Sequence, residues 1–145
     1  MNNDVEAFSL TSRPLKGGLA NALQKTIKTK LIPSSNEVLV KIYFTTVTID
    51  DINISEGTEL GGIPLSPSPS SNKPVTPGVE MSGIVAGVGK NVVDFTIGDA
   101  VFGTVGFPFT RHGAWSEYCC VKPDFLFHKP NYLSYPQAAA FSGSG

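Results

Sequence analysis

The sequence contains 145 residues with a formal net charge of −1; 41% of the residues are apolar and 16% are charged. These values predict one folded domain and exclude a disordered chain. The near-zero net charge lacks the cationic excess that a phosphate backbone attracts, so no nucleic-acid partner is expected. No apolar run reaches the about 20 residues of a membrane-spanning helix, and the polar start at residues 1–4 does not resemble a secretory signal. We therefore expect a cytoplasmic protein.

The first 36 residues are expected to lead into the main fold. Residues 5–11 predict a short strand. Residues 15–30 predict one or two helical turns, because apolar residues recur there at spacings of three and four. These apolar positions are Leu19, Ala22, Leu23 and Ile27. Lysines gather in the same stretch, at Lys16, Lys25, Lys28 and Lys30. They would form either a solvated helix face or a contact with a partner or a membrane surface.

Residues 37–132 are expected to form the main domain. Residues 37–49 have the clearest strand pattern, with apolar side chains that alternate between two faces. Asp50 and Asp51 end this strand, and residues 52–57 predict a short helical turn. Residues 60–77 are rich in proline and serine and predict a loop without regular structure, because each proline removes a backbone donor. A loop of this length is either functional or mobile.

Short strands then follow in quick succession, with glycines at the corners. They are predicted at residues 81–88, 98–103, 113–121 and 125–129. This pattern is typical of a mainly β fold that closes, or partly closes, into a barrel. The glycines at residues 87–92 are interpreted as a β-turn in which they supply positive φ.

The last residues predict the beginning of a helix. Ser134 is the expected N-cap, Pro136 lies in the first turn, and Gln137 completes a capping box. A well-capped helix that has hardly begun indicates a chain that is cut short or that continues elsewhere. The only cysteines, Cys119 and Cys120, are adjacent. Neighbouring strand residues point to opposite faces, so we expect one buried and one half-exposed thiol and no disulfide.

The order of several motifs over residues 37–145 resembles a known family. The motifs are Pro77-Gly78-Val79-Glu80-Met81-Ser82-Gly83-Ile84-Val85, Val88-Gly89, Gly98-Asp99-Ala100-Val101-Phe102-Gly103, Gly113-Ala114-Trp115-Ser116-Glu117-Tyr118 and residues 133–141. Together they resemble the N-terminal catalytic domain of the medium-chain dehydrogenase/reductase superfamily, in its zinc-independent, quinone-oxidoreductase-like branch. Residues 49–57 and the proline-rich loop are similar to a fungal subgroup of that branch.

This resemblance implies a GroES-like, partly open and incomplete β-barrel with short helices over residues 37–132. Residues 133–145 would begin the helix that leads to a Rossmann domain, which this sequence does not contain. The implied reaction is reduction of a small quinone or enone by NADP(H), with the cofactor bound only in a full-length protein. In this family, strands that return after the Rossmann domain complete the barrel. The isolated chain would then expose an apolar face, which favours a homodimer or a protein partner.

The resemblance also supplies candidate site residues. Glu80 would lie beneath the active site, and Asp50 and Asp51 would lie near the nicotinamide. Thr48 is a candidate for cofactor contact. The alternatives are that Glu80 is an ordinary loop acid and that the aspartates cap a helix.

No metal site is expected, because Val79 stands where zinc-dependent members have histidine. In addition, His112 and His128 lack partners at metal-ligand spacing.

The sequence is consistent with three classes of function. The first is a fragment of a zinc-independent NAD(P)H-dependent oxidoreductase that supplies the substrate side of the cleft and is inactive alone. The second is a non-catalytic interaction protein that kept the barrel and lost the redox half; a membrane-associated protein is one candidate for its partner. The third is a co-chaperonin-like module, which would need a mobile apolar loop and assembly into a ring.

Overall fold

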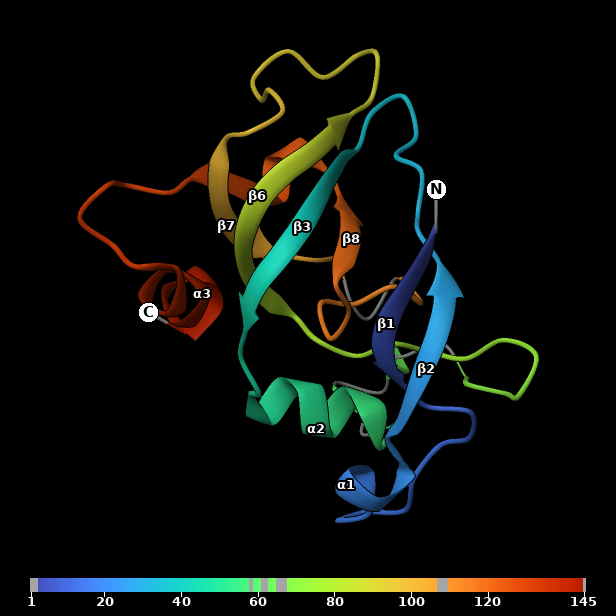
Figure 1. The fold of residues 1–145 in the computed structure, drawn as a ribbon. Helices are drawn as coiled ribbons and strands as arrows, with labels where there is room; N and C mark the ends of the chain where they lie inside the picture. Colours follow the sequence, from blue (N-terminus) through green and yellow to red (C-terminus); the bar gives the residue numbers. More distant parts are fainter. Residues whose placement is uncertain (1–2, 58, 61–62, 65–67, 107–109, 145) are drawn as a thin grey trace.

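The computed structural model describes residues 3–57, 59–60, 63–64, 68–106 and 110–144. The chain is mainly β, with strands in an antiparallel five-stranded sheet in the order β8-β3-β6-β7-β9 and in two small two-stranded sheets (Figure 1). The elements in chain order are β1 (Asp4–Ser9), α1 (Leu19–Ala22), β2 (Gln24–Thr29), β3 (Val38–Thr45), α2 (Ile49–Ser55), β4 (Glu59–Leu60), β5 (Ile63–Pro64), β6 (Glu80–Val88), β7 (Ala100–Thr104), β8 (Tyr118–Val121), the 3₁₀ helix η1 (Pro123–Phe125), β9 (Leu126–His128) and α3 (Tyr135–Ser144). The mainly β prediction is confirmed, and the sheets are not closed into a barrel.

Strands β3 and β6 form the centre of the sheet and pair over most of their lengths. The first three residues of β3, Val38–Val40, are buried, and Val38 and Val40 pack with side chains of β6, β7 and β8 in the main core. The predicted strand at residues 37–49 is confirmed for Val38–Thr45, but the chain leaves the sheet earlier than expected. Helix α2 begins at Ile49, so the two aspartates lie in its first turn and do not end the strand.

The predicted helix over residues 15–30 is wrong beyond Ala22. Only Leu19–Ala22 is helical, and Gln24–Thr29 forms β2, which pairs in register with β1. The β-branched side chains of this segment, such as Thr26 and Ile27, favour the extended conformation, and pairing with β1 supplies the backbone partners that a short helix lacks. The spacing of apolar residues therefore did not indicate a continuous helix.

The lysines of this segment consequently share no helical face. Lys25 Nζ pairs with Glu6 Oε1 at 2.7 Å. Lys28 Nζ donates to the buried Thr76 hydroxyl at 3.2 Å, and Lys30 Nζ lies 4.1 Å from the centre of the Tyr118 ring. Three of the four lysines are thus engaged within the molecule.

Two other predicted segments differ in the structure. The loop at residues 60–77 contains a small antiparallel pair, β4 with β5, and bridges between Ser70 and Lys73 and between Leu10 and Val75. Residues 61–62 and 65–67 of that predicted loop lie outside the described residues. The predicted strand at residues 113–121 is regular only from Tyr118, because its first half makes isolated bridges to other segments.

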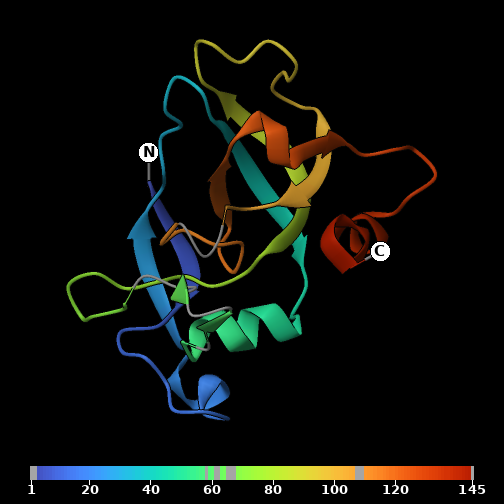
Figure 2. The ribbon, with the colours of Figure 1, turned by 180° about the vertical axis from the view of Figure 1, so that it is seen from behind.

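Helix α3 lies against the sheet beside β3, β6 and β7 (Figure 2). Its predicted capping box is present: the Gln137 side chain accepts from Ser134 N at 2.9 Å, and Gln137 N donates to Ser134 Oγ at 3.4 Å. Ala138 and Ala139 are buried, and the Ser82 hydroxyl donates to the Tyr135 carbonyl at 2.7 Å. Small side chains on one face therefore let this helix approach the sheet closely.

The two cysteines match their expected burial. Cys119 is buried, Cys120 is half-buried, and both are free thiols. Desolvation raises the pKa of the Cys119 thiol, and burial followed by the nearby negative charge of Glu37 raises the pKa of Cys120 to about 12. Neither thiol is a ready nucleophile at neutral pH.

Gly83 in β6 marks a position where two backbones approach too closely for a side chain. A Cβ atom there would collide with the carbonyl oxygen of Lys41 in β3. We expect Gly83→Ala to lower the free energy of unfolding by about 1–3 kcal/mol, because the central strand pair must shift to relieve the overlap. Urea denaturation followed by circular dichroism measures the change.

Gly106→Ala is the matched control, since no atom of the described residues lies within 4 Å of a Cβ placed at Gly106. Its effect should stay within about 0.5 kcal/mol. Equal stability of the two variants would show that the strand pair absorbs a methyl group without cost.

Candidate functional site

The connection from β3 to α2 is fixed by a capping box. Asp51 N donates to Thr48 Oγ1 at 3.3 Å, and Thr48 N donates to Asp51 Oδ2 at 2.7 Å. The Thr48 hydroxyl in turn donates to Asp51 Oδ2 at 3.0 Å. Each residue thus satisfies a backbone donor of the other, as a capping box requires. The helix N-cap is Thr48, so the alternative that either aspartate is the N-cap is wrong.

Asp51 also binds a segment that is remote in the sequence. Its side chain is fully buried, and its Oδ1 accepts from the backbone N–H of Val79 at 2.9 Å. Burial raises the pKa of Asp51 above its usual value, although the bonds from Thr48 and Val79 oppose the shift; the charge of Glu80 raises it further. One carboxyl group therefore holds the start of α2 against the Pro-Gly corner that precedes β6.

Glu80 is the second buried acid of this region, with only 2% of its surface exposed. Its Oε2 accepts from the Thr46 hydroxyl at 2.6 Å, and its carbonyl accepts from the Thr45 hydroxyl at 2.7 Å. On the opposite side it faces α3, because a Cβ added at Gly143 would lie 2.6 Å from Glu80 Oε1. The Glu80 side chain is therefore enclosed by β3 and α3.

The structure thus brings together three of the four candidate residues. Thr48, Asp51 and Glu80 belong to one cluster at the end of β3, which we call the Asp51–Glu80 cluster and which includes Thr46 and Val79. Asp50 is exposed and takes no part in these bonds. The Thr48 hydroxyl donates and accepts within the capping box, so its hydrogen-bonding capacity is largely used there.

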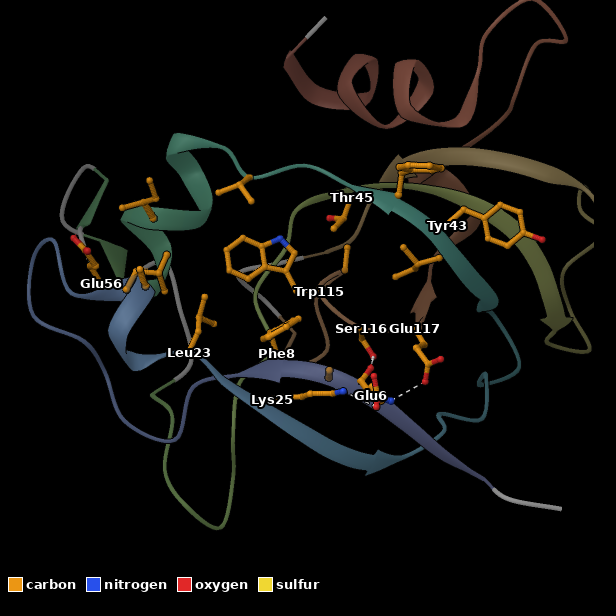
Figure 3. A pocket seen from close by; sticks show the side chains of 18 of the residues that line it. Glu6, Phe8, Leu23, Lys25, Tyr43, Thr45, Glu56, Trp115, Ser116 and Glu117 are labelled. Atoms are coloured by element: carbon orange, nitrogen blue, oxygen red, sulfur yellow. Dashed lines mark hydrogen bonds and ion pairs between the residues drawn. The ribbon is translucent and has the colours of Figure 1, made fainter.

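An apolar groove of about 880 Å³ lies beside this cluster (Figure 3). It is lined mainly by apolar side chains of β1, α1, β3, α2 and the segment before β8, among them Phe8, Leu19, Leu23, Val47, Ile52 and Trp115. None of the four candidate residues lines the groove. Trp115 forms its central wall and donates from Nε1 to the Thr46 carbonyl at 3.0 Å, so groove and cluster share the Thr46 segment.

Charged groups occupy one end of the groove (Figure 3). Lys25 pairs with Glu6 at 2.7 Å, and Glu117 Oε2 accepts from the Glu6 N–H at 2.7 Å. The ladder between β3 and β8 ends at Lys41, and Ile42 N still donates to the Glu117 carbonyl at 2.8 Å, while the pairing of β3 with β6 continues to Thr45. The groove therefore combines apolar side chains with the part of the β3 edge beyond Ile42, which pairs with no strand among the described residues.

The sequence reasoning did not find this groove. Its lining residues come from separate segments of the sequence. Trp115, the residue at its centre, is buried. The available signal was the alternation in β1, where Phe8 lies on the exposed face of the strand.

We looked for two kinds of site in the described part of the chain: a cluster of metal ligands and a glycine-rich turn that could bind a phosphate. Among those residues, no three histidine, cysteine, aspartate or glutamate side chains are grouped to hold a metal ion. The expected turn at residues 87–92 is present, but its glycines do not have positive φ. Instead, Gly89 is required for space, because a Cβ there would collide with the Ser34 carbonyl. The backbone at Ser34 and Ser35 therefore occupies the space beside Gly89 in which a bound phosphate would have to lie.

We expect Asp51→Asn to lower the free energy of unfolding by about 1–3 kcal/mol. The carboxylate accepts from three donors, and an amide would place N–H groups against Thr48 or Val79. Because the folded-state pKa of Asp51 is raised, its contribution to stability is greatest at low pH and falls as pH rises through that pKa. Urea unfolding between pH 4 and pH 8 should show a smaller pH dependence in the variant.

Asp50→Asn is the control for this experiment, because the neighbouring aspartate is exposed. Its stability should remain within about 0.5 kcal/mol of the original protein at every pH. If both variants behave alike, the Asp51 bonds do not stabilise the junction between α2 and the Pro-Gly corner.

Comparison with known proteins agrees with this geometry. Residues 34–131 match the alcohol dehydrogenase GroES-like domain. Quinone oxidoreductase of Sus scrofa is 35% identical over 109 residues, which are 75% of this chain and 30% of that protein. The mitochondrial NAD(P)H oxidoreductase RTN4IP1 of Homo sapiens is 32% identical over 116 residues, which are 76% of this chain and 29% of that protein.

A solved structure shows the same fold. The crystal structure of human synaptic vesicle membrane protein VAT-1 homolog-like protein has a TM-score of 0.77 and 26% identity, and the match covers 95% of this chain and 39% of that one. This chain spans about 30% of the length of the two curated relatives. No helix in the described residues is long and apolar enough to cross a membrane. The chain belongs to the alcohol dehydrogenase GroES-like domain family of the medium-chain dehydrogenase/reductase superfamily.

Proposed function

We propose that this chain is the substrate-side domain of a zinc-independent NAD(P)H-dependent oxidoreductase that reduces quinones or enones. The observation that carries the proposal is the Asp51–Glu80 cluster, which lies within the residues that match the GroES-like domain. The names of the two curated relatives support the reaction class and the cofactor class. Reduced nicotinamide supplies a hydride to the electron-poor carbon of the acceptor, and a proton from solvent completes the reduction.

The residues of the cluster are proposed to position the cleft. Asp51 holds the start of α2, and Glu80 holds Thr46. Precise placement of reacting groups supplies a large part of the rate in such transfers, so a rigid cluster is useful even if its carboxyl groups never touch the substrate. Val79 contributes its backbone N–H to Asp51 and has no side-chain atom that binds a metal.

NAD(P)H is proposed to bind mainly to a second domain encoded outside this sequence. The turn at Gly89 offers no backbone cradle for the phosphates, since the Ser34 segment lies against it. Residues 1–36 and 37–132 would then form the catalytic domain, and residues 133–145 would begin the connection to the cofactor domain. Further residues of the complete protein would cover the apolar groove and pair with the open edge of β3.

A non-catalytic interaction protein is the second candidate, and the apolar groove is the observation that favours it. Such a groove beside an open strand edge suits an extended partner segment or a second copy of the chain. We place either form of the protein in the cytoplasm. The two candidates differ in whether reduced nicotinamide is consumed.

The first test compares the 145-residue chain with the polypeptide that its complete coding sequence encodes. We expect the 145-residue chain alone to oxidise no NADPH in the presence of 1,4-benzoquinone or a simple enone. A polypeptide that also contains a nicotinamide-binding domain should catalyse the reaction, as followed by NADPH absorbance. In that polypeptide, Glu80→Gln should lower kcat about tenfold, because the Thr46 hydroxyl loses its charged acceptor and the cluster is positioned less precisely.

Asp50→Asn is the matched control and should keep full activity, because Asp50 is exposed. Turnover by the 145-residue chain alone would refute the need for a second domain. A complete polypeptide that binds NADPH normally but reduces neither acceptor would refute the proposed reaction and favour the interaction protein.

A further inference from the structure

The proline- and serine-rich loop contains an exposed serine next to a proline. Ser68 precedes Pro69, and its side chain is on the surface. The bridge from Leu10 to Val75 fixes the end of this loop to the body of the molecule. Ser68 is therefore accessible to another protein while the base of its loop is anchored.

Arg111 reaches this loop from a segment remote in the sequence. Its Nη1 donates to the Ser68 carbonyl at 3.1 Å and to the Lys73 carbonyl at 2.9 Å. These two bonds use the hydrogens of one guanidinium nitrogen, and the group carries three further N–H donors. A guanidinium group with this fork is the side chain best suited to hold a phosphate.

The surroundings of Arg111 carry an excess of positive charge. Burial lowers the pKa of the adjacent His112, and the positive charges of Lys28 and Arg111 lower it further, while Glu37 acts in the opposite direction. Lys28 is held in place by its bond to Thr76, and Thr76 N donates to the Arg111 carbonyl at 3.0 Å. Two cations and one acid thus act on His112, and the two cations disfavour its protonated form.

We propose that Ser68 is a phosphorylation site and that Arg111 binds the phosphoryl group. A protein kinase that recognises serine before proline would transfer the terminal phosphoryl group of a nucleoside triphosphate to Ser68 Oγ. The new P–O bond forms at that oxygen, the bond to the nucleoside diphosphate breaks, and the hydroxyl proton leaves to solvent. The inference is independent of the oxidoreductase reaction.

The added phosphate would change the loop through electrostatics. It brings a charge of about −1.5 to −2 and three acceptor oxygens at neutral pH. Arg111 already donates to the backbone carbonyl of Ser68, so we infer that the remaining donors of its guanidinium group would bind the phosphate oxygens. The loop would then be bound more firmly to the segment at Arg111 and His112, and the new negative charge would favour protonated His112.

The test uses the protein with phosphoserine encoded genetically at Ser68, and with phosphoserine at Ser71 as the matched control. Ser71 is exposed in the same loop. Phosphate at Ser68 should shift the His112 titration midpoint upward in NMR spectra. It should also slow amide exchange at Lys73 about three- to tenfold. Arg111→Gln should remove the slowing of exchange, and phosphoserine at Ser71 should produce smaller changes in both measurements.

Four results would overturn the proposal. The first is equal behaviour of the proteins phosphorylated at Ser68 and Ser71, and the second is a slowing of exchange that survives Arg111→Gln. The third comes from adding inorganic phosphate to the unmodified protein: the same His112 shift at millimolar concentration would identify a site for free anions instead. Mass spectrometry of the protein from its own cells should find phosphate on the peptide containing Ser68, and exclusively unmodified peptide would refute the modification.

Discussion

The buried carboxyl group of Asp51 is the interaction on which the candidate site depends. It accepts from the backbone and hydroxyl of Thr48 and from the backbone of Val79, and thereby joins α2 to the corner before β6. A buried carboxylate is costly unless donors surround it, so these bonds specify one arrangement of the two segments. Glu80 adds a second acid to the same region, and the proximity of its charge contributes to the raised pKa of Asp51.

Thr46 connects this acid cluster to the apolar groove. Its hydroxyl donates to Glu80, and its carbonyl accepts from the indole of Trp115. The turn between β3 and α2 thus has one polar contact on the side of the buried acids and one on the side of the groove. A ligand or segment that displaced Trp115 would remove the partner of the Thr46 carbonyl, which couples occupancy of the groove to the geometry of the cluster.

Patterns of neighbouring residues predicted two kinds of element: strands with one apolar and one polar face, and helices whose ends are capped by nearby side chains. The alternation in β3 and the capping box of α3 are of this kind. The segment Gln24–Thr29 was assigned to a helix because its pairing with β1 depends on contacts that a local pattern does not contain. The same holds for the groove, whose walls come from five separate parts of the chain. The spacing of Thr48 and Asp51 did contain the capping-box signal that identifies the true N-cap.

The candidate residues illustrate the difference between proximity in sequence and shared environment. Asp50 and Asp51 are neighbours, yet one is exposed and the other fully buried, because successive positions in the first turn of a helix face different directions. Glu80 joins Asp51 only through the fold. Gly143 extends that environment to α3, since the absence of a side chain there leaves room for the Glu80 carboxyl group. A displacement of α3 would expose this acid to water, so the position of the helix and the electrostatics of the cluster are linked.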